Sequence, residues 1–116
     1  MNDRASDNGD RGDLLRGALE MLILRTLQGG AQHGFGITES IRESSGEVLA
    51  IDEGSMYPAL YRMQRRGWID AEWGRSDNNR RAKFYALTDD GKRQLDVASE
   101  RWSRFSDAVR RVMGSV

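Results

Sequence analysis

Apolar residues that recur every three or four positions predict two helices near the start of the chain. The first is expected over residues 14–28, from Asp13 as its N-cap to a stop at Gly29 and Gly30. The second is expected over Phe35–Ser45. The positions of these two helices that should face a core are Leu15, Ala18, Leu19, Leu22, Ile23, Leu27, Ile37 and Ile41.

A third helix is predicted over Gly54–Arg66, because its apolar residues fall within one arc at about 100° per residue. Pro58 has no N–H and is tolerated only in the first turn, so either Ser55 caps this helix or a kink follows. We favour Ser55 at or near the N-terminus. The core-facing positions are Met56, Ala59, Leu60 and Met63.

Two segments rich in aromatic and branched residues, 68–73 and 82–87, flank the turn-forming run Asp77–Asn79. Such segments on either side of a polar turn predict a β-hairpin. Leu49 and Ile51, which precede the third helix, are candidates for a further short strand.

Thr88 is predicted to cap a last helix, which carries acidic residues in its first turn and continues to Met113. Three helices, a hairpin and one long helix predict an α+β, mainly α fold: a winged helix-turn-helix with a two-stranded β wing and a long C-terminal dimerisation helix. The expected division is a disordered polar tail at 1–12, a DNA-binding domain at 13–87 and the dimerisation helix at 88–116.

The composition excludes several classes of function. The chain has no cysteine and a single histidine, so it offers no disulfide, no thiol nucleophile and no His/Cys cage for a metal. No phosphate loop or nucleophile–base pair stands out, so we expect neither an enzyme nor a cofactor. His33 is predicted to be a turn or capping residue. The lack of a long apolar run or a signal-like start predicts a cytoplasmic protein without membrane contact.

The charge of the chain is unevenly distributed. The chain has 18 basic and 18 acidic residues, whereas residues 54–83 hold seven basic and three acidic ones, an excess of four. In a winged helix-turn-helix the third helix enters the major groove and the wing lies beside it, so this segment predicts binding of double-stranded DNA. The candidate DNA-binding residues are Ser55, Tyr57, Pro58, Tyr61, Arg62, Arg75, Arg80, Arg81 and Lys83.

Members of this set differ in how strongly they point to DNA. Arg62 is the candidate for a guanine edge. Tyr57 and Tyr61 fit equally well as residues that complete the core. Arg65 and Arg66 are expected to offset the helix dipole and to be solvated rather than to contact DNA.

The last helix carries a seam of apolar residues that alternate in steps of three and four, the spacing of a coiled coil. One chain has no second helix to cover such a seam, so we expect a homodimer that places two winged domains on two half-sites. The expected interface residues are Leu95, Ala98, Trp102, Phe105, Val109 and Val112.

In these segments the chain resembles the PadR family of bacterial transcription regulators. The order and spacing of the motifs carry the resemblance: LLRGALEMLILRTL (14–27), HGFGI (33–37), GSMYPALYRMQRRGWI (54–69) and EWGRSDNNRRAKFYALTDDGK (72–92). The resemblance implies a winged helix-turn-helix that binds a near-palindromic operator and represses, although nothing in the residues fixes the sign of regulation. The alternative is a winged helix that serves only as a protein-interaction module and does not bind DNA.

Trp102 has two interpretations. It is favoured as an interface anchor, since aromatic residues are common at such seams. The stretch SERWSRFSDAV (99–109) is also similar to that of LmrR-like multidrug sensors of this family, in which paired tryptophans sandwich planar aromatic ligands. That resemblance implies a ligand-binding cavity lined by Trp102, Leu14, Gly17 and Met21.

Overall fold

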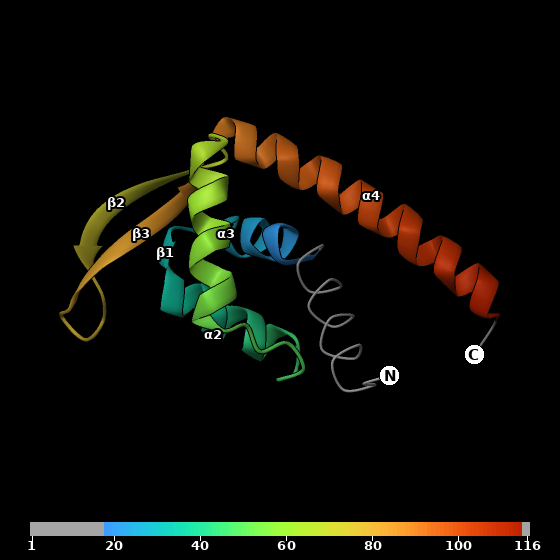
Figure 1. Ribbon diagram of the computed structural model, residues 1–116, viewed down its shortest axis with the longest axis horizontal. Helices are drawn as coiled ribbons and strands as arrows, with labels where there is room; N and C mark the ends of the chain where they lie inside the picture. Colours follow the sequence, from blue (N-terminus) through green and yellow to red (C-terminus); the bar gives the residue numbers. More distant parts are fainter. Residues whose placement is uncertain (1–17, 115–116) are drawn as a thin grey trace, which may run out of the picture.

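The computed structural model describes residues 18–114 as helices packed around a small antiparallel sheet (Figure 1). The hairpin projects to one side of α3, and α4 extends to the other. The tail at 1–12, Asp13 and the first turn of the predicted first helix lie outside the described residues. The elements are the first helix, described over 18–27, β1 (Gln32–His33), α2 (Gly34–Ser44), α3 (Glu53–Arg65), β2 (Ile69–Arg75), β3 (Arg81–Leu87) and α4 (Asp89–Met113).

Two of the predicted helix starts are confirmed by their capping bonds. His33 caps α2, since its Nδ1 accepts a hydrogen bond of 3.0 Å from the N–H of Gly36. Thr88 caps α4, since its hydroxyl accepts one of 3.0 Å from the N–H of Gly91. Both side chains satisfy N–H groups that the first turn of a helix leaves without a partner.

The third helix begins within one residue of its predicted start and Ser55 lies near its N-terminus as expected, but Ser55 is not its cap. Asp52 caps this helix by accepting a hydrogen bond of 2.8 Å from the N–H of Ser55, so Ser55 already lies in the first turn. Pro58 therefore falls in the second turn of one continuous helix. Its missing N–H leaves the carbonyl of Gly54 without its intrahelical donor, and solvent can replace that donor because Gly54 is exposed.

The hairpin is confirmed, with β2 and β3 paired in register from Ile69 opposite Leu87 to Arg75 opposite Arg81. The loop at 76–80 closes through the Ser76 N–H, which donates to the Arg80 carbonyl at 2.9 Å. Positive φ at Asn79 (58°) is a conformation that asparagine tolerates in turns.

The third strand of the sheet differs from the prediction. It is β1, which pairs with β3 and gives the order β1-β3-β2. Leu49 and Ile51 form no strand, and their side chains pack on the core instead. Burial of apolar side chains, rather than pairing of the backbone, therefore explains the apolar character of that segment.

The core lies where the first helix, α2 and α3 meet the base of the hairpin and the start of α4. The apolar arcs predicted for α2 and α3 are buried as expected. Within residues 18–114, no helix is both long enough and apolar enough to span a bilayer. The buried residues are Leu19, Ile23, Leu24, Leu27, Ile37, Ile41, Ile51, Met56, Ala59, Leu60, Met63, Ile69, Tyr85 and Leu95.

The start of α4 is fixed to the turn between α3 and β2. The Thr88 hydroxyl donates a 2.6 Å hydrogen bond to the Gly67 carbonyl, and the Thr88 N–H donates one of 3.1 Å to the Trp68 carbonyl. Gly91 packs so closely on this turn that a Cβ at its position would overlap the Trp68 carbonyl oxygen. Glycine is therefore the residue that lets α4 dock here.

Replacing Gly91 by alanine should destabilise the protein by about 1–3 kcal/mol, because the added methyl meets backbone that cannot move aside cheaply. Chemical denaturation at one protein concentration measures this. Gly54→Ala is the matched control, since a Cβ there meets only the Asp52 carboxylate at 3.5 Å and alanine favours the helix by up to about 1 kcal/mol. Equal stability of Gly91→Ala and wild type would contradict the close approach.

Candidate functional site

The burial of one face of α3 leaves the opposite face open to solvent. Tyr57 and Tyr61 are 47% and 61% exposed, and Ser55 is half-buried. The exposed residues of this outer face are Tyr57, Pro58, Tyr61, Arg62, Arg65 and Arg66.

Arg62 lies at the edge of the outer face, beside the first helix. Its Nε lies 3.5 Å from the Glu20 carboxylate, which also pairs with Arg66 at 3.1 Å. The centre of the face holds Arg65, whose Cζ lies 5.8 Å from the ring centroid of Tyr61. Arg65 is expected from the sequence to have a smaller role than Arg62, whereas among the described residues Arg62 has an acidic partner and Arg65 has none. Sequence reasoning also missed Glu20, which lies far from α3 along the chain.

Tyr57 packs against α2 and is still partly open to solvent. Its ring covers Gly34 at the start of α2, where a Cβ would lie 2.9 Å from the ring, so it helps to hold α2 against α3. It still exposes about half of its surface. Burial raises the pKa of the Tyr85 phenol, and the charge of a Tyr57 phenolate raises it to a lesser degree. Tyr61 is the more exposed of the two residues.

The wing carries its cations on one face. Side chains alternate between the two faces of a hairpin. The face that is buried in the core at Ile69 therefore carries, farther along the hairpin, Trp73, Arg75, Arg81 and Lys83. Trp73 is 57% exposed; the Cζ of Arg81 lies 4.4 Å from its ring centroid, and the Nζ of Lys83 lies 6.0 Å from it. Trp73 therefore orders two of the four cations, a role that the sequence did not suggest.

The four predicted wing cations have no acidic partner among residues 18–114. Within the part of the chain that the structure describes, none of them forms an ion pair with a carboxylate. Arg75 donates to the Asn79 carbonyl at 3.2 Å and so supports the turn, while Arg80 lies exposed in the loop. The arrangement suits an anionic, repeating surface such as a phosphate backbone.

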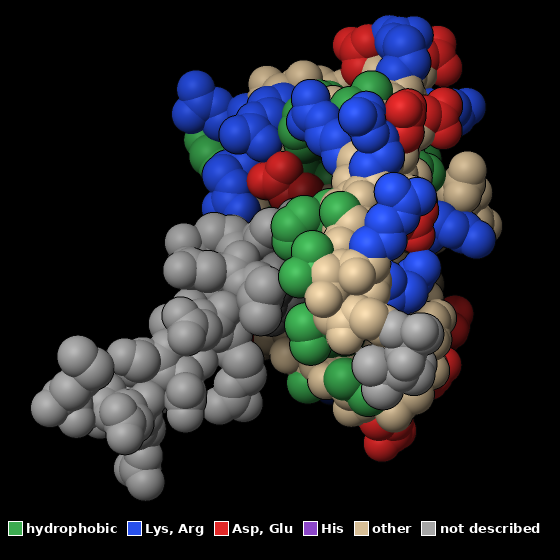
Figure 2. All heavy atoms as spheres, turned by 90° about the vertical axis from the view of Figure 1, so that its right-hand side faces the viewer, with side chains coloured by type: hydrophobic (Ala, Val, Ile, Leu, Met, Phe, Trp, Pro, Cys, Tyr) green, Lys and Arg blue, Asp and Glu red, His purple; other side chains and the backbone are tan. Residues whose placement is uncertain are grey.

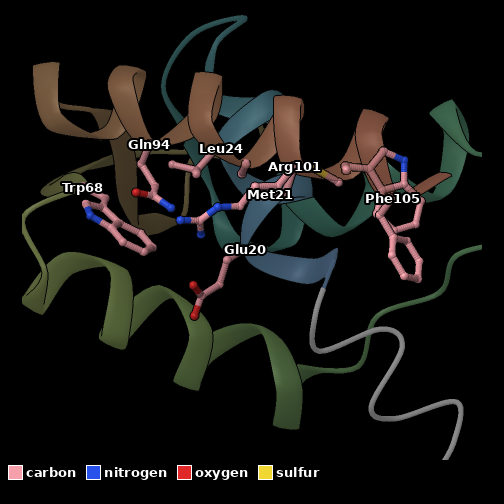
Figure 3. Close-up of a pocket in the computed structure, with 9 residues that line it drawn as sticks. Glu20, Met21, Leu24, Trp68, Gln94, Arg101 and Phe105 are labelled. Carbon is pink, nitrogen blue, oxygen red and sulfur yellow. The ribbon is translucent and has the colours of Figure 1, made fainter. Parts of the chain in front are cut away.

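A pocket of about 310 Å³ lies between the first helix and α4 (Figure 3). Met21 and Trp102, both predicted to line a cavity, line it together, whereas Leu14 and Gly17 lie outside the described residues. Arg101 reaches across it above Glu20. The lining residues are Glu20, Met21, Leu24, Trp68, Gln94, Ala98, Arg101, Trp102 and Phe105.

The apolar seam of α4 has a buried part at Leu95 and an exposed part beyond it. That residue is 3% exposed and belongs to the core of its own chain, so the free part of the seam begins at Ala98. Figure 2 shows hydrophobic side chains in a band along the molecule, bordered by Lys and Arg side chains. The exposed large residues of the seam are Trp102 (49%), Phe105 (59%), Val109 (42%) and Val112 (86%).

Three helices, a hairpin that follows the third of them and a long terminal helix define a winged helix-turn-helix protein. The family model described as "Transcriptional regulator PadR-like family" matches residues 23–97. The chain therefore belongs to the PadR-like family of transcriptional regulators. Regulation of transcription, rather than catalysis, is its class of function, as the sequence predicted.

Solved structures and a curated relative agree with this assignment. A transcriptional regulator from Clostridium thermocellum is 27% identical, with a TM-score of 0.76, over 84% of this chain and 94% of that one. A PadR-like transcriptional regulator from Bacillus cereus is also 27% identical, with a TM-score of 0.76, over 90% and 99%. The negative transcriptional regulator PadR of Bacillus subtilis is 30% identical over 77 residues, 66% of this chain and 42% of that protein.

Proposed function

We propose that this protein binds a near-palindromic operator in double-stranded DNA as a homodimer, with α3 in the major groove and the wing on the adjacent phosphates. The observation that carries this proposal is the cationic face of the wing, which holds Arg81 and Lys83 unpaired with any acid among residues 18–114. The outer face of α3 adds Tyr61 and Arg65, with Arg62 at its edge.

Repression is the mode of regulation that we propose. The relative from Bacillus subtilis is named a negative regulator, and a protein that covers an operator excludes other proteins from it. The second candidate is a winged helix that only binds proteins, in which case the cations of the wing would not contact DNA. Titration of the protein with a labelled duplex separates the two, since only the first predicts salt-dependent binding.

Replacing Arg80 and Arg81 together by alanine should weaken binding to every duplex. Each lost phosphate contact should also lower the slope of log affinity against log salt by about 0.9, hence by about 2 per subunit. Fluorescence anisotropy at several salt concentrations measures both effects. The control is Arg93→Ala with Arg110→Ala, which removes the same charge from two arginines paired within α4. An unchanged slope in the wing variant would remove the wing from the DNA interface.

Dimerisation is proposed from the apolar face of α4. Beyond Leu95 none of the described residues of this helix is buried, although several are large and apolar. A single chain leaves this surface in water. Two copies, antiparallel or parallel, would bury it, and each Å² of apolar surface removed from water would stabilise the dimer by about 25 cal/mol. The residues expected at the interface are Ala98, Trp102, Phe105, Val109 and Val112.

Val109→Asp should convert the dimer to a monomer or weaken it by at least about tenfold, because a charge would enter a desolvated seam. Val97→Asp is a matched control: Val97 and Val109 are 41% and 42% exposed, but Val97 lies outside the seam. Sedimentation velocity over a range of concentrations distinguishes the variants. Equal assembly of the two variants would place the interface elsewhere.

A planar aromatic ligand is proposed for the pocket between the first helix and α4. The pocket volume falls at the lower end of small-molecule sites, and Trp102 and Met21 supply an aromatic and an adaptable apolar wall. The Trp102 ring also lies 6.1 Å from that of Phe105, so the pocket offers two adjacent aromatic rings. The competing interpretation, that Trp102 only anchors the dimer, predicts no ligand.

A planar cationic dye that binds this pocket should quench the fluorescence of Trp102. The chain has two further tryptophans, Trp68 in the pocket and Trp73 on the wing, so the quenching should fall sharply in Trp102→Phe. Trp73→Phe is the control and should leave the quenching intact. A panel of dyes without effect on wild-type fluorescence would favour the role of Trp102 as an anchor.

A further inference from the structure

The Glu20 carboxylate joins the first helix to α3. Its two oxygens pair with two arginines one turn apart at the C-terminal end of α3, where Arg66 is the C-cap: Oε2 lies 3.1 Å from Arg66 Nη1, and Oε1 lies 3.5 Å from Arg62 Nε. Glu20 is 24% exposed, the least exposed of the three side chains. Among the described residues, these are the only ion pairs that join one helix to another helix or to its cap residue.

The two arginines are therefore drawn toward the first helix and away from the open centre of the outer face. The guanidinium of Arg66 is held from a second side, since its Cζ lies 5.0 Å from the ring centroid of Trp68. The negative charge of the Glu20 carboxylate also lowers the net charge of this cluster from +2 for the two arginines alone to +1. A phosphate that approaches this edge of α3 must compete with Glu20 for both cations.

We propose that Glu20 is a positioning residue that restrains Arg62 and Arg66 and thereby limits the affinity of the protein for DNA. The inference rests on the proposed DNA-binding function. Glu20 contacts no DNA itself and acts only through the two arginines. Because Glu20 also lines the pocket beneath α4, the restraint lies at the junction of the pocket and α3 (Figure 3).

Removal of the carboxylate should release both arginines. Exposed ion pairs each contribute a factor of about 1.4 to 5, so Glu20→Gln should bind a labelled mixed-sequence duplex about three- to tenfold more tightly. Its salt dependence should steepen by up to about 2 per subunit, because two further cations reach phosphates. Glu100→Gln is the charge-matched control. That residue is exposed on α4, forms no ion pair among the described residues and should change affinity by less than about twofold.

A second background separates the restraint from a general effect of charge. This background is the double variant Arg62→Gln with Arg66→Gln. Adding Glu20→Gln to it releases no arginine, so the affinity for DNA should change no more than Glu100→Gln changes it. Glu20→Asp keeps the charge and should bind as wild type to within about twofold. Thermal unfolding of each variant verifies that it is folded under the conditions of the titration.

Three outcomes would overturn the inference: unchanged or weaker duplex binding by Glu20→Gln, an equal gain in the background without the arginines, or a gain in Glu20→Asp as large as in Glu20→Gln. In each case wild type still binds the duplex in a salt-dependent manner, so the proposed function stands. A wild-type protein that binds no duplex would overturn both.

Discussion

The burial of a single stripe of α3 is the constraint on which the rest of the structure depends. Met56, Leu60 and Met63 are almost fully enclosed, so α3 has one rotation about its axis that satisfies the core. That rotation turns Tyr61 and Arg65 outward and brings the edge of α3 against the first helix. It also sets the direction in which β2 leaves the core, because Ile69 is buried only four residues after α3 ends. The outer face of α3 and the wing therefore have a fixed relation that needs no ligand to create it.

A second junction decides what lies on the other side of the molecule. Thr88 uses its hydroxyl both as donor to Gly67 and as acceptor from Gly91, so the start of α4 has little freedom. From there the helix extends away from the core over most of its length (Figure 1). The rigid start gives the exposed apolar residues beyond Leu95 a defined direction. Two copies that pair through them would then hold two wings at a fixed separation, which is what recognition of two half-sites requires.

The sequence predicted those parts of the fold that depend on neighbours along the chain. Helical spacing located the buried arc of α3, and the acidic turn after Thr88 located the start of α4. It failed where the structure depends on a choice between local alternatives or on distant residues. Asp52 and Ser55 are both good N-caps three residues apart, and nothing local decides between them. β1 has only two residues, too few for any periodicity, and its partner is the distant β3.

The same limit explains why the candidate site was only partly predicted. A helical projection shows that Arg62 and Arg65 both point away from the core, but it does not show that Glu20 lies beside Arg62. It also does not show that Trp73 is stacked with the cations of the wing, because that contact depends on the register of the hairpin. Pairwise contacts between elements thus decide which arginines are free, and these contacts appear only in three dimensions.

The pattern of ion pairs explains how a chain without net charge presents a cationic surface. Three of the five acids of α4 pair with basic residues three positions along the same helix, as Asp107 does with Arg110, so part of the charge of that helix is compensated locally. The wing has no such pairs among the residues that the structure describes, and its excess of cations remains open to a polyanion. Between these two regions Glu20 compensates the edge of α3. Net charge therefore says little about affinity for DNA here, since at short range a duplex responds to the cations that are not already paired.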